Sequence, residues 1–422
     1  MAGNSAPYVK TFNCPSCGGQ VSIRASGFSI NVVCQSCHAV IDSTNENYKI
    51  IARVQSKKKP TIDIPLGSRG KLFGTFWEIV GFILKEDLSE YRWKEYLLFN
   101  PRQGYRWLSE YEGHWNFIKM TKQKPELSGD TATLNGKTYE KFASNTAVTK
   151  FVAGEFYWQI RLEDRCKMEE FISPPHILSM EYDDEEIVWS VGEKISSQVV
   201  KTAFKLEGIP KESGIAPNQV NPYKSNADAM KKLAYLFIVL AFVIQIFSIA
   251  QKKNLVVLDQ EFTLPLLPQE KITRSDSFNL SGHPDNLEIK MFTKVLNSWI
   301  EVQGEVINEN KNDEAINFSN LVEYYYGSDM DGSWAEGSQV NETTLPSIPQ
   351  GTYHINFDSV STEPTINPIN NDSRKFSLVV TRSVPSWSNF WWTVLILMIF
   401  PAFYVWRSSR FENARWEQSS IN

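Results

Sequence analysis

The chain of 422 residues carries 43 basic and 48 acidic side chains, for a formal net charge of −5. It therefore lacks the basic excess of a general nucleic-acid binder, and nucleic acid is not an expected partner. Its mean hydropathy of −0.30 is ordinary for soluble protein, so any membrane segments are a minor part of the chain. The length allows two or three domains, each with its own core.

The first predicted element is a zinc ribbon over residues 1–50. Cys14-Pro-Ser-Cys17 and Cys34-Gln-Ser-Cys37 are two C-x2-C pairs. Two such turns together complete a tetrahedral site of four sulfurs, for which Zn²⁺ is the favoured ion and iron the alternative. Four thiolates leave no coordination position for water, so we expect a structural metal site. His38, directly after Cys37, is either a replacement or supporting ligand or an exposed loop histidine.

Residues 60–207 form the second predicted domain. Short aromatic stretches alternate apolar and polar residues, with turn signals every 8–12 residues. This pattern predicts a β-barrel or β-sandwich module, and with it a mainly β chain. Tyr91-Arg-Trp93 and Phe156-Tyr157-Trp158 are similar enough to leave open a duplicated module.

Several stretches of this domain carry a family resemblance: IPLGSRGKLFGTFWEIVGFI, WKEYLLFNP, GYRWL, GHWNF, GEFYWQIRLED, PPHILSMEY and EEIVWSVGEKI. In these stretches the domain resembles the bacterial family known as domain of unknown function 4178. A zinc ribbon ahead of the domain is also similar to members of that family. The resemblance implies a membrane-associated role, in a gene context similar to envelope-stress and polyamine-related systems. The family has no agreed activity, so the resemblance implies no chemistry.

His114 is the residue of this domain with the clearest potential for chemistry. Glu95, Glu110 and Glu112 are near it in sequence, and a histidine beside a carboxylate can act as a general acid or base. A histidine packed among aromatic residues in a β-turn is the competing interpretation. Cys166 lies between two basic residues, which could lower its pKa, but no cluster of histidines accompanies it. An ordinary thiol is therefore the favoured interpretation. We predict no catalytic residue and keep His114 as a candidate ligand-binding residue.

Two apolar segments predict membrane crossings after a Pro-, Asn- and Ser-rich linker at residues 208–232. Residues 233–250 carry no charge and would span about 27 Å as a helix, which is enough for a bilayer core. Residues 390–406 form the second segment, with Trp391 and Trp392 at one end and Trp406 at the other, as in an interfacial aromatic belt. We expect two transmembrane helices. Two buried core helices are the alternative.

The distribution of basic residues and cysteines predicts the orientation. Arg407, Arg410 and Arg415 follow the second span, which places the tail at residues 407–422 inside the cell. Two crossings then place the N-terminus inside as well, where thiolate ligands survive best. We predict a two-pass protein of the inner cell membrane with both termini cytoplasmic and membrane lipid around its spans. The amphipathic tail could lie on the inner leaflet.

Residues 255–384 form the third predicted domain, an extracytoplasmic β-sandwich that is jelly-roll-like and free of disulfides. Its segments alternate at period two between polar turns. Asp329 and Asp331, just before a glycine, could hold calcium, with a plain turn as the alternative. Trp334 could form an aromatic binding face with nearby tyrosines, with strand packing as the alternative.

Three functional hypotheses remain. The first is a membrane-anchored, non-catalytic binding and coupling protein that links the outer β-domain to the inner ribbon and β-module, in the setting of envelope stress. The second is a structural subunit of an oligomeric envelope complex. The third, least favoured, is an enzyme centred on the cytoplasmic β-domain. Protein partners, either copies of this chain or a multi-span membrane protein, are expected in the first two.

Overall fold

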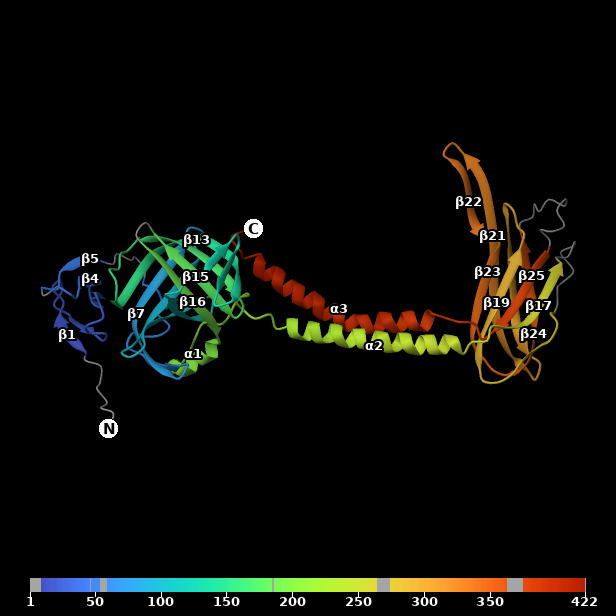
Figure 1. Ribbon diagram of the computed structural model, residues 1–422, viewed down its shortest axis with the longest axis horizontal. Helices are drawn as coiled ribbons and strands as arrows, with labels where there is room; N and C mark the ends of the chain where they lie inside the picture. The colour runs from blue at the N-terminus through green and yellow to red at the C-terminus, as the bar shows by residue number, and fades with distance from the viewer. Residues whose placement is uncertain are drawn as a thin grey trace. The chain divides into compact units, whose positions relative to one another are not determined.

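The computed structural model describes residues 9–45, 47–53, 59–183, 186–263, 274–362 and 375–421. Strands make up 51% of the structure and helices 17%, which confirms the predicted mainly β class. The chain forms two compact units (Figure 1). The first comprises Met1–Ala229 and Ala402–Asn422, and the second comprises Met230–Pro401.

The first unit begins with a small ribbon of short antiparallel strands. β1 pairs with β2, β3 pairs with β4, and β4 pairs with β5. Val21, Ile23, Val32 and Ile41 form a small core around the buried Cys34. A core of this size is too small to stabilise a domain alone, so a metal cross-link is expected. The strands are β1 (Lys10–Asn13), β2 (Gln20–Ile23), β3 (Asn31–Val33), β4 (Ala39–Asp42) and β5 (Ile50–Arg53).

The ribbon is followed by a closed, antiparallel, eight-stranded β-barrel. The order around the barrel is β7–β8–β9–β10–β16–β15–β14–β13, and β13 pairs with β7 to close it. Each half is a meander of four consecutive strands, and the halves join at the β7–β13 and β10–β16 pairs. The structure thus selects the barrel over the sandwich for this domain. Its strands are β7 (Thr75–Asp87), β8 (Arg92–Asn100), β9 (Gly104–Tyr111), β10 (His114–Thr121), β13 (Lys137–Phe156), β14 (Arg165–Ser173), β15 (His176–Tyr182) and β16 (Ile187–Ile195).

Two glycines make the closure of the barrel possible. Gly154 on β13 lies opposite Gly81 on β7. A Cβ on Gly154 would lie 2.1 Å from the carbonyl oxygen of Val80, and one on Gly81 would lie 2.6 Å from the carbonyl oxygen of Glu155. Gly154 also has a φ of +86°, in the region that favours glycine. The backbones therefore approach here more closely than any side chain would allow.

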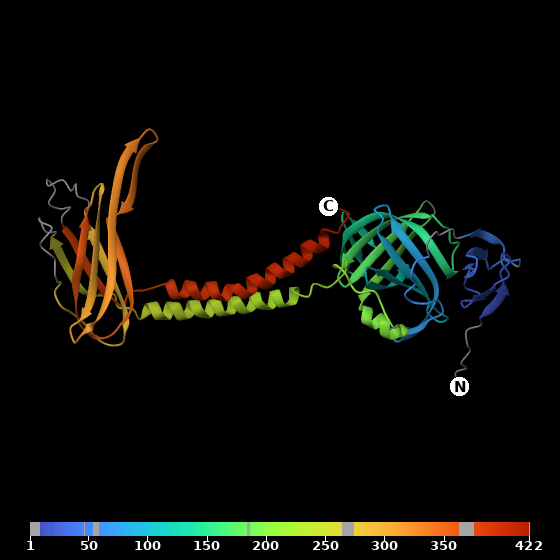
Figure 2. The ribbon, with the colours of Figure 1, turned by 180° about the vertical axis from the view of Figure 1, so that it is seen from behind.

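Smaller elements cover the outside of the barrel. β6 (Arg69–Leu72) pairs with the start of β7, and the hairpin of β11 (Glu126–Ser128) and β12 (Thr131–Leu134) extends the sheet from β13. Helix α1 (Ser197–Phe204) is capped at its N-terminus by Ser196, whose side chain accepts a hydrogen bond from the N–H of Gln198. It buries Val200 and Phe204 against the main core of the unit. Figure 2 shows α1 against the outside of the barrel.

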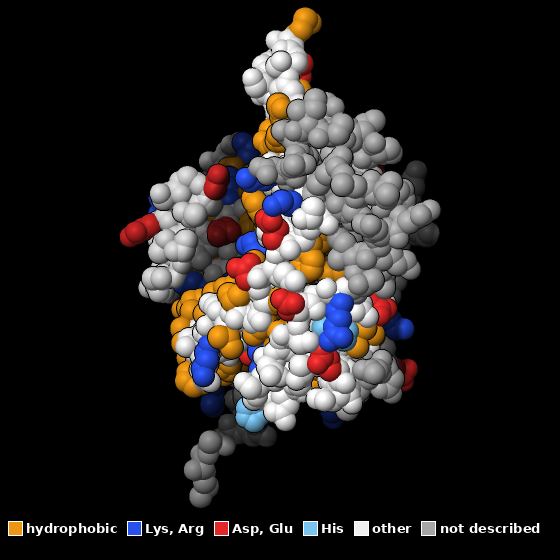
Figure 3. All heavy atoms as spheres, turned by 90° about the vertical axis from the view of Figure 1, so that its right-hand side faces the viewer, with side chains coloured by type: hydrophobic (Ala, Val, Ile, Leu, Met, Phe, Trp, Pro, Cys, Tyr) orange, Lys and Arg blue, Asp and Glu red, His pale blue; other side chains and the backbone are white. Residues whose placement is uncertain are grey.

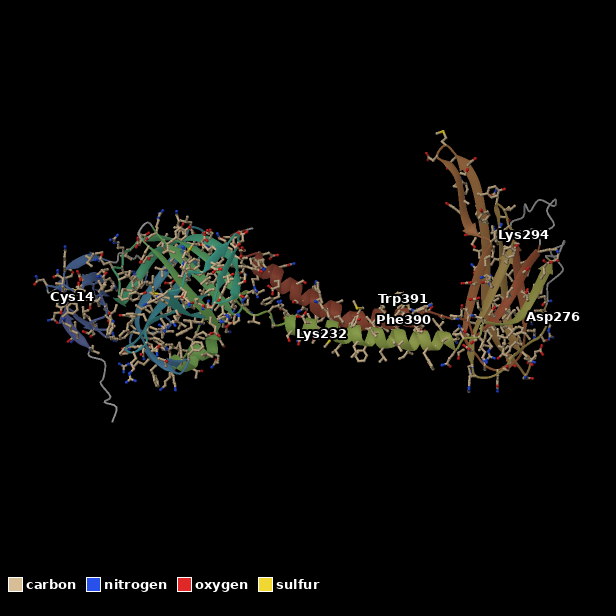
Figure 4. The ribbon with its side chains drawn as sticks, viewed as in Figure 1. Cys14, Lys232, Asp276, Lys294, Phe390 and Trp391 are labelled. Atoms are coloured by element: carbon tan, nitrogen blue, oxygen red, sulfur yellow. The ribbon has the colours of Figure 1, made fainter. Side chains whose placement is uncertain are left out.

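Two long apolar helices connect to the second unit. α2 (Lys224–Ala250) and α3 (Ser388–Trp416) are each long and apolar enough to cross a membrane. Only 6% and 11% of their most apolar windows are buried, so the alternative of two buried core helices is wrong for this structure. Within the second unit, the ring of Phe242 on α2 lies 6.0 Å from that of Phe390 on α3, and Figure 4 labels Phe390 beside the exposed Trp391.

Both helices extend beyond the predicted spans. α2 starts at Lys224, so residues 224–232 of the predicted linker are helical, in keeping with their content of Ala, Met and Lys. α3 continues past residue 406 to Trp416, so most of the predicted tail is helical as well. The apolar pattern predicts only the segment able to lie in lipid. The ends of a helix also depend on capping and on packing of its polar residues, which that pattern does not show.

The second unit also contains a β-sandwich of a four-stranded and a five-stranded sheet. The first strand pairs with the last (β17–β25), the second with the next to last (β18–β24), and β19 with β23 around the central β20–β21 pair. These nested antiparallel pairs define a jelly roll, as predicted, with β22 as an addition at one edge. The strands are β17 (Leu255–Thr263), β18 (Phe278–Leu280), β19 (Asp285–Thr293), β20 (Ser298–Asn308), β21 (Lys311–Asp329), β22 (Gly332–Ser338), β23 (Val340–Ile348), β24 (Gly351–Thr362) and β25 (Lys375–Arg382).

The sandwich core follows from the alternation seen in the sequence. Along β20 every second side chain is buried, which places Ile300, Val302 and Val306 inside. Phe376, Leu378 and other residues of the facing sheet complete this core. No cysteine falls between the two apolar segments, so no disulfide stabilises this domain.

Candidate functional site

The four paired cysteines lie on two turns with the same backbone geometry. In the first turn the N–H of Cys14 donates to the carbonyl of Gly19, and that of Gly18 donates to the carbonyl of Cys14. In the second turn the N–H of Cys34 donates to Ala39, and that of His38 donates to Cys34. The C-x2-C sequence therefore forms a repeated knuckle. Figure 4 labels Cys14 in this ribbon.

The four sulfurs meet in a single cluster. Cys14 Sγ lies 3.6 Å from Cys37 Sγ, and Cys17 Sγ lies 3.8 Å from Cys34 Sγ. All four sulfurs lie within 4.8 Å of one another. Tetrahedral zinc with Zn–S bonds of about 2.3 Å separates its sulfurs by about 3.8 Å. The cluster therefore fits one tetrahedral metal ion, and no open position for a substrate would remain.

His38 has a structural position in the second knuckle. Its φ of 56° matches the left-handed conformation of Gly18 in the first knuckle. Its ring lies 6.2 Å from that of Phe151 on β13, in an edge-on arrangement. Among the described residues, the group able to hold a metal consists of the four cysteines without His38. The four-cysteine cluster is complete without His38, whose half-buried ring lies against the barrel and is not fully exposed in its loop.

A buried carboxylate joins the ribbon to the barrel. Glu155 is 1% exposed and accepts hydrogen bonds from the N–H groups of Arg24 and Ala25 and from the hydroxyl of Ser29. β3 of the ribbon also pairs with the end of β13. Burial raises the pKa of Glu155, while these hydrogen bonds act in the opposite direction. The ribbon with its four-cysteine cluster and the barrel are therefore parts of one packed structure.

A charged cluster occupies the barrel interior. Lys85 Nζ on β7 lies 3.0 Å from Glu181 on β15 and 3.3 Å from Glu95 on β8. Since β13 and β14 separate β7 from β15 around the barrel, the contact with Glu181 crosses the interior. The indole N–H of Trp93 donates to Glu95 at 2.8 Å. Burial favours the neutral amine, but Glu181 and Glu95 outweigh it and raise the pKa of Lys85.

Two further ionisable groups face this cluster. Burial, reinforced by the carboxylates of Glu181 and Glu95, raises the pKa of Glu170 to about 7. Burial likewise raises the pKa of Cys166 to about 11, although Lys85 acts in the opposite direction. This direction favours an ordinary thiol at Cys166 over a thiol whose pKa is lowered by its basic neighbours in sequence. A protonated thiol at neutral pH is a poor nucleophile.

His114 is closed off from solvent at one end of the barrel. It is 4% exposed, and its Nε2 lies 2.8 Å from the carbonyl oxygen of Ser213. Its Nδ1 lies 3.5 Å from Glu212. A Cβ on the adjacent Gly113 would lie 2.3 Å from the carbonyl oxygen of Lys211, so the linker crosses directly over this turn. The candidate ligand-binding role of His114 receives no support from this position, because the histidine fastens the linker to the barrel.

The C-terminal segment packs on the barrel, a contact that the sequence did not predict. The Trp416 ring lies 5.5 Å from that of Phe142 and joins the cluster of Ile172 and Ile177. The hydroxyl of Ser419 donates to the carbonyl of Phe142, and the N–H of Ser144 donates to Ser420 Oγ at 2.8 Å. The expectation that the tail lies on a lipid leaflet is replaced by this contact with protein.

The same segment also holds the linker. The side chain of Arg415 is only 4% exposed. Its guanidinium donates to the carbonyl of Gln219 and pairs with Glu412 at 3.1 Å. Asn221 donates to Glu412 at 2.9 Å, and Arg407 stacks on the ring of Tyr223. We call the contacts of residues 407–420 with the linker and the barrel the clamp. Arg415 and Arg407 carry the positive charge that predicts a cytoplasmic tail, and in the structure both bind the linker.

Asp329, Asp331 and Trp334 lie together on the exposed hairpin of β21 and β22 in the second unit. We call this hairpin, residues 323–338, the arm. The N–H of Asp331 donates to Asp329 Oδ1 at 3.0 Å, which closes a plain turn. Every residue of β22 is exposed, and Met330 at the tip is completely so. Figure 3 shows this arm at the top of the view, ending in a hydrophobic side chain. Trp334 lies over Gly327 of the paired strand, so it packs within the arm while remaining 44% exposed.

The fold and its sites define a class of protein: a mainly β chain in which a four-cysteine ribbon joins an eight-stranded barrel, with two apolar helices and a jelly roll. Residues 65–197 match the family described as domain of unknown function, DUF4178. The match covers the strands of the barrel and confirms the resemblance seen in the sequence. The matched residues run from just before β6 to the start of α1.

Other comparisons add no argument about function. No curated protein matches the chain. One similar solved structure, described as "Structure of infectious bursal disease virus Gt strain", has 10% sequence identity over 85% of this chain and 71% of that chain. Its TM-score is 0.12, which is too low to support a shared fold.

Proposed function

We propose that this protein is a membrane-anchored, non-catalytic coupling protein, in which two transmembrane helices link the jelly roll outside the cell to the zinc-bound ribbon and barrel inside. The observation that carries the proposal is the clamp. The linker that enters α2 and the segment that leaves α3 are held together on one barrel through Asn221, Arg415 and Trp416. Movement of one span relative to the other therefore strains the clamp and the barrel.

The clamp also supports the proposed topology. Because the clamp holds Ser419 and Ser420 on the barrel, we propose that the two termini of the chain lie on the same side of the membrane that the helices cross. Four clustered thiolates favour the reducing cytoplasm for that side and zinc as the ion. The acidic, cysteine-free jelly roll then lies outside the inner membrane, with about 19 acidic against about 8 basic residues over 255–384.

Envelope stress is the setting that we propose for this coupling, with a protein partner on at least one side of the membrane. No catalytic residue is assigned. His114 is held by the linker, and Cys166 is held as a thiol by burial. The barrel and jelly roll are folds that serve many functions, so the proposal rests on the clamp and not on the folds.

The topology is tested by labelling in intact cells. A single cysteine at the arm (Ser333→Cys) in a Cys166→Ser background reacts with a membrane-impermeant maleimide if the jelly roll is outside. A cysteine at Ser128 (Ser128→Cys), on the exposed β11 of the barrel, reacts only after the cells are opened. Equal labelling of both positions in intact cells would refute the two-pass arrangement.

The coupling is tested by cross-linking the spans at the end away from the clamp. Gln245 Nε2 donates to the carbonyl of Ser386 at 2.7 Å, so Gln245→Cys with Ser386→Cys places two thiols at neighbouring positions. We expect oxidation of this pair to slow hydrogen exchange at residues 142–144 and 219–223. The change should disappear when Trp416→Ala is added. Identical exchange in the oxidised and reduced proteins would contradict coupling.

A structural subunit of an oligomeric envelope complex is the second candidate, and the arm favours it. A two-stranded hairpin is marginally stable in water by itself, and β22 contributes no buried side chain. β22 also has neither Lys nor Pro, the residues that usually protect an edge strand. Particle mass in mild detergent distinguishes the candidates, because a large uniform particle built of this chain alone indicates the structural subunit.

A further inference from the structure

A groove with a volume of about 580 Å³ lies outside the barrel, between α1 and the β6–β7 hairpin. It is separate from the metal cluster, the barrel interior and the clamp. Its walls carry three cationic side chains, Arg69 and Lys71 from β6 and Lys205 from the end of α1. Among the described residues that line it there is no carboxylate. In a chain with a net charge of −5, this concentration of positive charge requires an explanation.

Local backbone geometry creates the groove. A Cβ on Gly70 would lie 2.8 Å from the ring of Phe204 and 2.9 Å from the carbonyl oxygen of Ala203, so α1 lies directly on the backbone of β6. Lys205 then ends the helix in the left-handed conformation, with its N–H donating to the carbonyls of Lys201 and Thr202. The cationic end of α1 is therefore held beside the cationic strand β6.

The positive charge of the groove is largely uncompensated. Arg69 pairs with Glu78 at 2.9 Å, but Glu78 also pairs with Arg24 at 3.1 Å and so serves two cations. Lys71 lies over the ring of Phe76 at 5.8 Å. Within the described parts of the chain, neither Lys71 nor Lys205 forms an ion pair. An anion in the groove would meet two unpaired ammonium groups and one shared guanidinium.

Apolar surface borders the same groove. Phe76 is 67% exposed, Val199 is 49% exposed, and Phe73 at the neighbouring turn is 60% exposed. Large apolar side chains beside basic residues are the composition of surfaces that lie at a membrane interface. A ligand with an anionic head and an apolar body would satisfy both parts of the groove.

We propose that this groove binds the phosphate head of an anionic phospholipid, with Lys71, Lys205 and Arg69 around the phosphate and with Phe76 and Val199 against the first carbons of the lipid. The inference rests on the proposed membrane anchorage. The linker and α2 keep the barrel close to a lipid surface, so a modest intrinsic affinity is sufficient for binding. A soluble phosphate ester shares the head-group chemistry, and the experiment separates the two sources.

The test uses the full chain in lipid nanodiscs, made either of phosphatidylcholine alone or with about one third phosphatidylglycerol. Hydrogen exchange of α1 and of the β6–β7 turn is followed by mass spectrometry. We expect exchange there to be at least about fivefold slower with phosphatidylglycerol, because each of the three basic residues can contribute about that factor at an anionic surface. Lys71→Glu with Lys205→Glu should abolish the difference.

The matched control carries the same change of charge at another exposed site. Lys122→Glu with Lys124→Glu, in the β10–β11 loop, should retain the lipid-dependent slowing. Equal exchange in both kinds of nanodisc would overturn the proposal. Slowing by millimolar glycerol phosphate in phosphatidylcholine discs would also overturn it, in favour of a soluble ligand. A protein that fails to enter the discs at all refutes the membrane anchorage instead, so the two failures are distinguishable.

Discussion

The carboxylate of Glu155, at the end of β13, accepts a hydrogen bond of 2.6 Å from the backbone N–H of Arg24. The same carboxylate accepts hydrogen bonds from Ala25 and Ser29, and its side chain is almost completely buried. One side chain of the barrel therefore organises a turn of the ribbon more than a hundred residues earlier. Two of the three donors to this carboxylate are backbone N–H groups of the ribbon, which a change of side chain in the ribbon would leave in place.

Removal of this carboxylate should loosen the ribbon without unfolding the barrel. Glu155→Ala leaves two N–H groups without an acceptor, at a cost of about 3 kcal/mol in the free energy of unfolding. We expect faster hydrogen exchange over residues 20–33 with unchanged exchange in β8–β10. Glu163→Ala, at an exposed carboxylate paired with Lys150, is the control and should have little effect. Equal effects of the two variants would contradict the assignment.

The barrel interior should make stability depend on pH. Glu170 has a folded pKa of about 7, against an ordinary value of 4.5, so the folded state binds its proton more tightly. The stability that this proton contributes is complete below about pH 4.5 and is lost as the pH rises towards 7. At about 1.4 kcal/mol per pKa unit the loss amounts to about 3 kcal/mol.

Glu170→Gln removes the titrating group, so its free energy of unfolding should vary less between pH 5 and pH 8 and exceed that of the parent protein at pH 8. Chemical denaturation at several pH values measures this. Glu169→Gln, at the preceding residue of β14, which pairs with Lys141, is the control. If Glu170→Gln retains the full pH slope of the parent protein, another group is responsible.

The ribbon should contain one tightly held zinc ion per chain. Cys34→Ser removes a ligand of the cluster and should abolish binding of zinc and folding of residues 9–53, because the remaining core is small. Elemental analysis and hydrogen exchange provide the two measurements. His38→Asn keeps a residue that tolerates the left-handed conformation and should retain zinc in full. Loss of zinc in that variant would restore His38 as a ligand.

The clamp should depend on Trp416. Trp416→Ala leaves a gap against Phe142, Ile172 and Ile177, with an expected cost of about 2 kcal/mol for a partly buried ring. The C-terminal segment should then be cleaved by carboxypeptidase several times faster in detergent. Glu417→Ala, at the next residue, is the control. Unchanged cleavage in Trp416→Ala would mean that the polar contacts hold the clamp without the Trp416 ring.

Closure of the barrel should depend on Gly154, within β13, more than on a glycine at a turn between strands. Gly154→Ala forces a Cβ to within 2.1 Å of the Val80 carbonyl, in addition to the strain of a positive φ. We expect this variant to misfold or lose most of its stability. Gly104→Ala has a similar φ of +71° but nothing within 4 Å of the new Cβ, so it should cost only about 1 kcal/mol. Thermal unfolding of the two purified variants provides the comparison.

Local sequence patterns predicted much of this fold. The spacing of Cys14, Cys17, Cys34 and Cys37 predicted one tetrahedral cluster, because two residues between cysteines set the geometry of a knuckle whatever lies around it. The period-two pattern of residues 255–384 predicted a sandwich, since alternation alone defines which side of each strand is buried. The two apolar segments predicted long exposed helices for the same local reason.

Long-range contacts were outside the reach of these patterns. The similar stretches at Tyr91–Trp93 and Phe156–Trp158 do not occupy equivalent places in the two meanders. The first enters β8, the second strand of its half, whereas the second ends β13, the first strand of its half. Three of the residues singled out in the sequence, Asp329, Asp331 and Trp334, lie on one exposed arm, while His114 lies under the linker.

By itself, the sequence determined the two cysteine knuckles, the mainly β class and the two apolar helices, because each depends on residues that are close together in the chain. The tertiary structure alone decided that the domain closes as a barrel, that Glu170 faces Lys85 in its interior, and that Trp416 packs on Phe142. These contacts join residues far apart in the chain. Whether a charge is buried, or a ring is packed, depends on distant residues that local sequence patterns do not identify.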